Sequence, residues 1–285
     1  MDRNRKPRIA YGFWRYARGE ADAAMRMIET ARAAGVTHFD TADVYGGGEF
    51  GGAEALLGDI RKRAPSLLAG IEIATKAGVE FGTPYNSSKD YIAGAADASL
   101  RRLGVEAVDL FYIHRPDLFA HPEEVAGALD TLVAAGKAKA VGVSNYSPAQ
   151  VAALRRYLKA PLTAHQIEFS ALHVDPIFNG ALDQAMEQGI DLFAWSPLAG
   201  GRLFAEGNAR AVRVRAVLDA YAKGRGLSPE AVALVFLLSH PSRPTPIVGT
   251  KTVERFSACL KALDISMSRR DWYAILQASL GEGLP

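Results

Sequence analysis

Short apolar runs alternate with longer segments of helical period from one end of the chain to the other. Eight runs rich in apolar and β-branched residues lie at 8–13, 36–40, 71–76, 108–114, 138–144, 162–169, 190–196 and 245–250. The segments between them, such as 22–35, 89–104, 122–137 and 147–158, have the apolar spacing of helices. This alternation predicts parallel strands joined by right-handed helical crossovers.

Eight such units predict a closed (β/α)8 TIM barrel, with an open doubly wound sheet as the alternative. Two segments fall outside the count: residues 201–226 predict an extra helix after the seventh strand, and residues 266–280 predict one at the C-terminus. No low-complexity linker or shift in composition interrupts the chain, and a length of 285 residues is ordinary for such a barrel. Residues 1–285 are therefore predicted to form a single domain.

The composition is that of a globular protein and gives no sign of a macromolecular partner. Hydrophobic residues make up 49% and charged residues 22% of the chain. The net charge is only +2 and the basic residues are scattered, which argues against nucleic-acid binding. The basic start, MDRNRKPR, is expected to be a frayed, solvated end.

Membrane, secreted and metal-binding classes are not expected either. The longest apolar run, AVALVFLL, is too short to cross a bilayer, and no signal-like segment opens the chain. Cys259 is the single cysteine, so an intramolecular disulfide is excluded, and no Cys/His spacing suits a metal. These features predict a cytoplasmic protein that binds neither membrane nor metal, and they leave its oligomeric state open.

The most informative feature is that polar and aromatic side chains gather where the predicted strands end. They are Asp40, Lys76, His114, Ser144, Asn145, Gln166, Trp195 and Ser196. Each alone has an ordinary explanation as a turn residue, a snorkelling lysine, a core histidine or a core aromatic residue. Together they converge on the carboxyl-terminal face of a barrel, where active sites of this fold lie.

Four of the residues near these ends can form one proton-transfer unit. The phenol of Tyr45 has an ordinary pKa of roughly 10, which is too high for an efficient acid at neutral pH. An ammonium beside it, from Lys76, stabilises the phenolate, and the carboxylate of Asp40 can hold that ammonium charged. His114 can orient a substrate carbonyl toward Tyr45. These residue types predict acid catalysis at a carbonyl oxygen that gains charge.

The chain resembles the aldo-keto reductases over nearly its whole length. The motifs DTADVYGG, ATKAG, FYIHRP, VGVSN, the glutamine of AHQIEFS, and AWSPLAGGRL follow in the family's order, with most similarity to a bacterial branch of oxidoreductases. The resemblance implies a (β/α)8 barrel, reduction of a small carbonyl substrate and a nicotinamide cofactor, usually NADPH. It also implies a tetrad of Asp40, Tyr45, Lys76 and His114, with Tyr45 as the general acid.

The resemblance further implies cofactor and substrate residues. Ser144, Asn145 and Gln166 match the groups that bind the cofactor carboxamide, and Trp195 matches the aromatic residue that stacks on the nicotinamide. The other cofactor candidates are Gly12, Phe13, Trp14, Asp40, Ser196, Leu198, Gly200, Gly249, Thr250, Lys251 and Arg255, the last three as contacts of the NADP 2′-phosphate. The substrate pocket is expected to contain Trp14, Tyr45, His114 and Phe204. Cys259 replaces the asparagine that often contacts adenine, so the chain departs from the family there.

A glycine-rich stretch offers a competing interpretation. Gly46, Gly48 and Gly51 spell the G-x-G-x-x-G of a dinucleotide-binding turn. In a Rossmann turn, however, the first glycine directly follows the strand, and an acid follows about twenty residues later at the end of the next strand. Here several polar or bulky residues lie between the end of the predicted strand and the first glycine. The glycines are therefore interpreted as a flexible turn after Tyr45.

Two other functions are weighed against carbonyl reduction. A nicotinamide-nucleotide-binding redox sensor or regulatory subunit with little turnover shares the fold, but a complete tetrad favours an enzyme. A metal-dependent hydrolase built on Asp40, His114 and His165 is disfavoured because no H-x-H or H-x-D occurs at a strand end. The short tail GEGLP predicts an open site with loose selectivity, and the sequence does not specify the physiological substrate.

Overall fold

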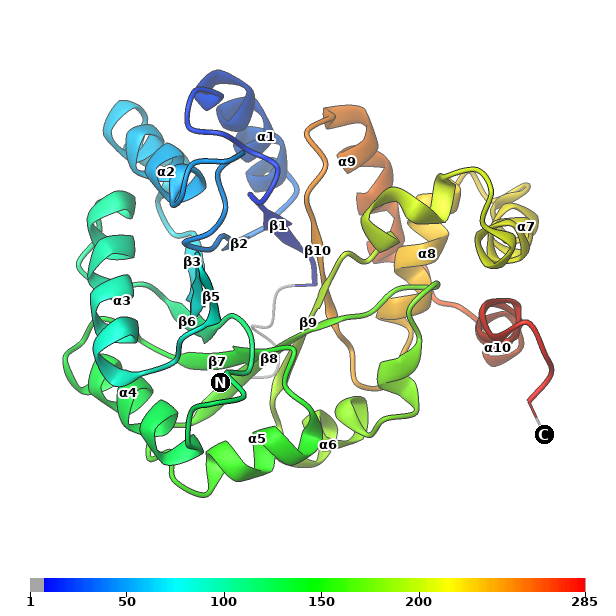
Figure 1. Ribbon diagram of the computed structural model, residues 1–285. Helices are drawn as coiled ribbons and strands as arrows, with labels where there is room; N and C mark the ends of the chain where they lie inside the picture. The colour runs from blue at the N-terminus through cyan, green and yellow to red at the C-terminus, as the bar shows by residue number, and fades with distance from the viewer. Residues whose placement is uncertain (1–7, 285) are drawn as a thin grey trace. The chain divides into compact units, whose positions relative to one another are not determined.

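The computed structural model describes residues 8–284, so the expectation for the basic start of the chain lies outside the described residues apart from Arg8, which is exposed. Eight parallel strands form a closed barrel in the order β1-β10-β9-β8-β7-β6-β3-β2 (Figure 1). Their bounds are Ala10–Gly12, Thr245–Val248, Asp191–Trp195, Leu162–Glu168, Val141–Ser144, Leu110–Ile113, Glu72–Ala77 and His38–Asp40 in that order. The predicted (β/α)8 fold is confirmed, and one barrel strand coincides with each of the eight expected runs, although β3 ends one residue after its run.

Ten α-helices and four short 3-10 helices are found among residues 8–284. The α-helices are α1 Ala21–Ala33, α2 Gly52–Arg63, α3 Lys89–Leu103, α4 Pro122–Ala134, α5 Pro148–Arg155, α6 Ala181–Gln188, α7 Ala209–Ala222, α8 Pro229–Leu238, α9 Val253–Leu260 and α10 Arg269–Leu280. The 3-10 helices are η1 Pro65–Leu68, η2 Asp175–Ile177, η3 Ala199–Phe204 and η4 Lys261–Asp264. In this described part of the chain, residues 8–284, no helix is long and apolar enough to cross a membrane.

Local sequence signals explain several helix ends. The Ser147 hydroxyl accepts a hydrogen bond from the backbone N–H of Gln150, and the Gln150 side-chain oxygen accepts one from the Ser147 backbone N–H. Pro148 occupies the first helical position of α5. Ser228 caps α8 in the same way through the N–H of Ala231. Gly104 ends α3 in the left-handed conformation that glycine adopts without steric cost.

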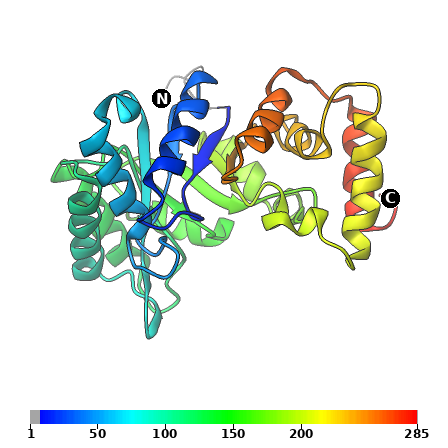
Figure 2. The same ribbon diagram turned by 90° about the horizontal axis from the view of Figure 1, so that it is seen from above.

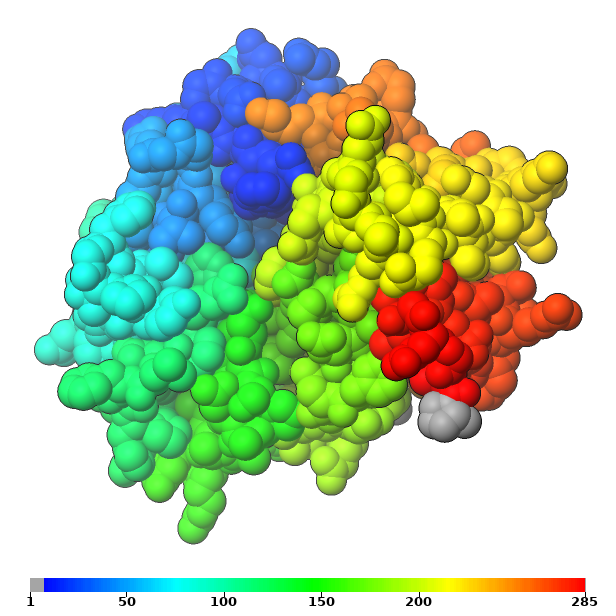
Figure 3. Space-filling model, turned by 45° about the vertical axis from the view of Figure 1, so that its right-hand side comes forward, coloured from blue at the N-terminus to red at the C-terminus, as the bar shows by residue number. Residues whose placement is uncertain are grey.

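The chain divides into two compact units, and each is described by itself. The first described here comprises residues 10–166 and 249–251, and in it α2, α3 and α4 lie outside the strands β2, β3 and β6 (Figure 1). The other comprises the remaining residues, and in it α7 and α10 lie side by side (Figures 2 and 3). A hydrogen bond from Arg213 Nε to the Ala278 carbonyl, 3.3 Å long, joins these two helices.

Two details differ from the sequence prediction. A small antiparallel hairpin, β4 Val79–Glu80 with β5 Thr83–Tyr85, follows β3. The expected helix over 201–226 is shorter, because η3 and a turn precede α7, which begins after Asn208. The Asn208 side chain accepts from the N–H of Ala211 and so sets the start of α7. The extra helix at the C-terminus is α10.

Candidate active site

Asp40, Tyr45, Lys76 and His114 lie together at the carboxyl ends of three neighbouring strands. Asp40 is the last residue of β2, Lys76 is the last but one of β3, and His114 directly follows β6. The three strands are adjacent in the barrel, and the register sets Asp40 beside Ala74 and Lys76 beside Tyr112. Tyr45 reaches the same place from the loop after β2. The barrel therefore brings all four candidates into one cluster.

Lys76 is the centre of this cluster. Its ammonium is fully buried, lies 2.7 Å from Asp40 Oδ2, and donates a second hydrogen bond of 2.7 Å to the Thr41 carbonyl. The same nitrogen lies 4.9 Å from the ring centre of Tyr45. The Tyr45 hydroxyl is in turn 3.5 Å from His114 Nε2, with the two rings nearly perpendicular. The geometry joins a carboxylate, an ammonium, a phenol and an imidazole in sequence.

Burial and charge set the protonation of these groups. Burial raises the pKa of the Tyr45 phenol above its ordinary value, and the Lys76 ammonium opposes that rise. Burial would lower the pKa of Lys76, but Asp40 and Tyr45 together raise it above its usual range. Burial, with the charges of Lys76 and Arg115, holds the pKa of His114 well below its usual range. At neutral pH the cluster therefore contains a charged lysine and a neutral histidine.

Three polar candidates lie beside the tetrad. The Gln166 amide nitrogen donates to Asp40 Oδ1 at 2.8 Å, so Asp40 binds Lys76 with one oxygen and Gln166 with the other. Asn145 donates to the Ser144 hydroxyl at 2.8 Å and to the His114 carbonyl at 3.2 Å. Ser144 and Gln166 are paired in register across β7 and β8. An amide and a hydroxyl are suitable groups to bind a carboxamide.

The predicted residues at β1 and after β10 form a second group. Gly12 ends β1, Phe13 is buried, and Trp14 is half exposed. A Cβ on Gly249 would lie 3.0 Å from the Trp14 indole nitrogen, so a side chain at this position would press against the indole. The Thr250 carbonyl accepts from the Tyr11 hydroxyl at 2.8 Å, which fixes the backbone beside Lys251.

The remaining candidates belong to the other compact unit. Trp195 is the last residue of β9 and is partly exposed, and Ser196 has a positive φ of 47°. Gly200 and Phe204 lie in η3, which Leu198 precedes, and Arg255 is exposed in the first turn of α9. All except Arg255 lie at or just after the carboxyl end of β9. Their roles stay predictions.

The glycine-rich stretch forms a tight turn that connects Tyr45 to α2. A Cβ on Gly46 would lie 2.2 Å from the Glu49 carbonyl oxygen and 2.6 Å from the Gly52 nitrogen. The Tyr45 carbonyl accepts from the N–H of Ala53, 2.9 Å away, which closes the turn on itself. The backbone thus folds against itself at Gly46, and this geometry supports the interpretation of the glycines as a turn.

Sequence reasoning missed a group of charged residues behind this turn. Glu54 is fully buried, forms an ion pair of 2.7 Å with Arg102, and accepts a hydrogen bond from the Thr75 hydroxyl. Asp43 is also fully buried, and neither of its carboxyl oxygens has a hydrogen-bond partner among the described residues. A glutamate inside the apolar segment AEALLGDI was the available signal, because charges are buried only when they are paired.

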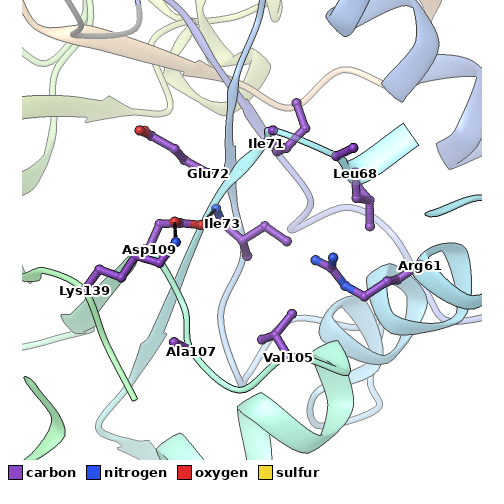
Figure 4. A pocket seen from close by; sticks show the side chains of 11 residues that line it. Arg61, Leu68, Ile71, Glu72, Ile73, Val105, Ala107, Asp109 and Lys139 are labelled. Carbon is purple, nitrogen blue, oxygen red and sulfur yellow. Dashed lines mark hydrogen bonds and ion pairs between the residues drawn. The ribbon is translucent and has the colours of Figure 1, made fainter. Parts of the chain in front are cut away.

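A cavity of about 410 Å³ lies at the opposite end of the strands. It is lined by the start of β3, including Glu72, by the segments before β3 and before β6, including Asp109, and by Arg61 of α2 (Figure 4). Two of its charges form a pair: Lys139 lies 2.7 Å from Asp109, which also accepts from the Ile73 N–H. Within residues 8–284, no cluster of three or more His, Cys, Asp or Glu could hold a metal ion.

The chain is similar to known proteins over almost all of its length. A model of the Aldo/keto reductase family matches residues 8–279. A Novosphingobium aromaticivorans protein named 6-dehydroglucose reductase is 45% identical over 283 residues, which cover 97% of this chain and 93% of that protein. An Agrobacterium fabrum protein of the same name is 38% identical, over 96% of this chain and 95% of its own.

A solved structure has the same fold along the whole chain. The glycerol dehydrogenase of Gluconobacter oxydans superposes with a TM-score of 0.84 at 25% identity, covering 98% of this chain and 94% of the other. The family match, the related sequences and the barrel itself point to one conclusion. The chain belongs to the aldo/keto reductase family, whose members are oxidoreductases that act on carbonyl groups.

Proposed function

We propose that this protein reduces aldehydes or ketones to alcohols with NADPH, and that Tyr45 is the general acid. The observation that supports this most strongly is the buried Asp40–Lys76 ion pair placed beside the Tyr45 ring. A buried ion pair is unfavourable to build unless it has further hydrogen bonds, and this one uses the Thr41 carbonyl and the Gln166 amide. Such an arrangement is suited to control the charge on a phenol.

Residues of the chain itself supply the proton that the substrate oxygen receives. As the carbonyl oxygen of the substrate gains negative charge, the Tyr45 hydroxyl gives it a proton. The Lys76 ammonium stabilises the phenolate that remains, and Asp40 keeps Lys76 charged while this happens. The neutral imidazole of His114, next to the Tyr45 hydroxyl, orients the carbonyl oxygen. The base form of Tyr45 would accept the proton in the reverse direction.

The polar groups around the tetrad fit a nicotinamide cofactor, which supplies the hydride when it is bound. Ser144, Asn145 and Gln166 would hold its carboxamide, since they offer a hydroxyl and two amides next to the tetrad. Trp195 would stack on its ring. Thr250, Lys251 and Arg255 would bind the adenosine end of the cofactor.

The choice of NADPH rests on the residues after β10. A hydroxyl, an ammonium and a guanidinium from Thr250, Lys251 and Arg255 are a suitable set for the 2′-phosphate that NADH lacks. Arg255 in the first turn of α9 is unfavourable there without an anion, because the helix dipole repels a cation at a helix start. We expect NADPH to bind at least tenfold more tightly than NADH. Arg255→Ala should weaken NADPH binding by about 1.5–3 kcal/mol and leave NADH binding nearly unchanged.

The first substrates to test are aldehydes of sugars. The two relatives that are 45% and 38% identical are each named 6-dehydroglucose reductase, and both align with nearly the whole chain. Identity of this extent supports a related substrate, although barrel loops vary freely over one chemistry. Trp14 and Phe204 would form walls of the substrate pocket, beside Tyr45 and His114.

A substrate panel tests the proposal. NADPH consumption is followed with 6-dehydroglucose, simple aldehydes, ketones and quinones, and the binding of NADPH and NADH is measured in parallel. We expect turnover with aldehydes and a faster reaction with the sugar aldehyde. Tight NADPH binding with no turnover of any carbonyl would contradict the proposal and favour a sensor.

A further inference from the structure

Lys251 is already held by a carboxylate of the same chain. Its ammonium lies 2.6 Å from Glu20 Oε1 and also donates to the Arg15 carbonyl at 3.2 Å. The same nitrogen lies 5.2 Å from the ring centre of Tyr16. These partners all come from the loop between β1 and α1, 231 to 236 residues away in sequence. The Lys251 side chain is therefore directed toward this loop and is bound to it.

Glu20 is itself fixed in a charged state. Its other oxygen, Oε2, accepts from the Ala17 backbone N–H at 2.8 Å. This hydrogen bond, followed by the contact with Lys251, lowers the pKa of Glu20 below its usual range. The carboxylate lies just before the first turn of α1, so it moves little without opening the Ala17 bond. Glu20 thus places a carboxylate directly beside the ammonium of Lys251.

The backbone on both sides of the pair is also held in place. The Tyr11 hydroxyl bonds the Thr250 carbonyl at 2.8 Å and the Tyr16 hydroxyl at 2.9 Å. Rearrangement at Lys251 must therefore come from its side chain. The Glu20 and Lys251 side chains are 35% and 38% exposed, and ion pairs this accessible to water contribute little to stability. The pair can open when a stronger anion arrives.

We propose that Glu20 competes with the cofactor 2′-phosphate for the ammonium of Lys251 and thereby limits the preference for NADPH. This inference rests on the proposed contact between Lys251 and the phosphate. A lysine ammonium has three donors, and two of them are used by Glu20 and the Arg15 carbonyl. A dianionic phosphate at Lys251 must displace the carboxylate or accept its repulsion. NADH has a neutral 2′-hydroxyl, so it neither has to displace the Glu20 carboxylate nor is repelled by it.

The test measures cofactor binding by calorimetry, without turnover. Dissociation constants for NADPH and NADH are determined for the wild type, Glu20→Gln, Lys251→Met and the double variant. Adenosine 2′,5′-bisphosphate and 5′-AMP serve as probes of the phosphate alone. Glu29→Gln is the matched control, because it removes the same charge from an exposed position in α1.

We expect Glu20→Gln to tighten NADPH and the bisphosphate about three- to tenfold and to change NADH and AMP less than twofold. The gain should shrink when Lys251 is methionine, and Glu29→Gln should change no cofactor by more than twofold. Weaker or unchanged NADPH binding in Glu20→Gln would overturn the proposal, because Glu20 would then position Lys251 or have no influence.

A different result would contradict the proposed contact between Lys251 and the 2′-phosphate. If Lys251→Met weakened NADPH and NADH equally, Lys251 would not contact the phosphate, and both proposals would be contradicted. If Lys251→Met weakened only NADPH while Glu20→Gln gave no gain, the phosphate contact would stand and the competition alone would be wrong.

Discussion

Lys76 is a fully buried ammonium whose oxygen partners both come from the end of β2. Burial of one charge costs several kcal/mol, so the site depends on Asp40 and the Thr41 carbonyl being present before any substrate arrives. The same constraint explains why the lysine is useful: its charge cannot be screened by water and acts directly on Tyr45.

Lys76→Met should therefore slow carbonyl reduction by about 10²–10⁴-fold. It removes the charge that opposes the rise of the Tyr45 pKa, so the phenolate forms only at higher pH. In the alcohol-oxidation direction, which needs the phenolate, the pH profile of kcat/KM should move to higher pH. Lys62→Met, at an exposed position of α2, is the control. Identical pH profiles for Lys76→Met and the wild type would remove Lys76 from the proton path.

Asp43 is a buried carboxyl that the proposed mechanism does not use. Burial, with the nearby Glu54 carboxylate, raises its pKa to about 8, against 3.8 for an ordinary aspartate. The folded protein therefore keeps this proton at pH values at which the unfolded chain has released it. Stability from this group is complete below about pH 4 and is lost as the pH rises toward 8.

Asp43→Asn should remove that dependence, because an amide does not titrate. Relative to the wild type, the variant should gain about 1–3 kcal/mol of unfolding free energy between pH 5 and pH 8. Urea unfolding at the two pH values measures this gain, with Asp219→Asn, exposed on α7, as the control. A stability difference that stays constant with pH would show that Asp43 is ionised in the fold.

At the scale of elements, the turn between β2 and α2 determines where Tyr45 lies. Gly46 has backbone atoms of Glu49 and Gly52 so close that no side chain fits, whereas a Cβ on Gly48 would meet nothing within 4 Å. The turn is braced from behind by the Glu54–Arg102 pair, which links α2 to α3. A change at Gly46 must therefore shift the turn.

Gly46→Ala should lower kcat at least tenfold, because even a small displacement of the acid is costly. Gly48→Ala is the matched variant: its φ of 106° also disfavours alanine, so the difference between the two isolates the clash. Circular dichroism checks that both variants are folded. Equal activity in the two would mean that the turn does not position Tyr45.

Most elements could be predicted from the sequence because their signals are local. Apolar runs gave the barrel strands, and caps such as Ser147 and Ser228 gave helix starts. The β4–β5 hairpin could not be predicted, since its strands have only two and three residues, include Pro84 and are largely exposed. They have neither the alternation nor the length of a strand signal.

The candidate site could be predicted where its residues lie at the ends of strands. The register of parallel neighbours brings Asp40, Lys76 and His114 together once the strand ends are known. The Glu20–Lys251 pair and the Glu54–Arg102 pair were missed, because each joins residues from separate helices or loops. Such contacts depend on tertiary packing, and no local sequence pattern predicts them.

At the scale of the molecule, the two ends of the barrel have different roles. The carboxyl ends of β2, β3 and β6 present the tetrad, whereas the start of β3 and the segment before β6 line a cavity that contains the Lys139–Asp109 ion pair. This division is usual for the fold, in which catalysis and stability are built at opposite faces.

We propose that the chain unfolds as a single domain. Its eight strands form one closed sheet, so the loss of any strand opens the ring and exposes unpaired backbone groups. Thermal unfolding followed by far-UV circular dichroism and by tryptophan fluorescence should give one shared midpoint. Two separate midpoints would indicate independent domains.

The central claim is that Tyr45 supplies the proton, and one variant tests it most directly. Tyr45→Phe removes the hydroxyl but little volume, so NADPH should bind within about twofold of the wild type while kcat for aldehyde reduction falls by about 10²–10⁴-fold. Steady-state kinetics beside calorimetric NADPH titration measures both quantities on one preparation. Near-wild-type reduction by Tyr45→Phe would contradict the account.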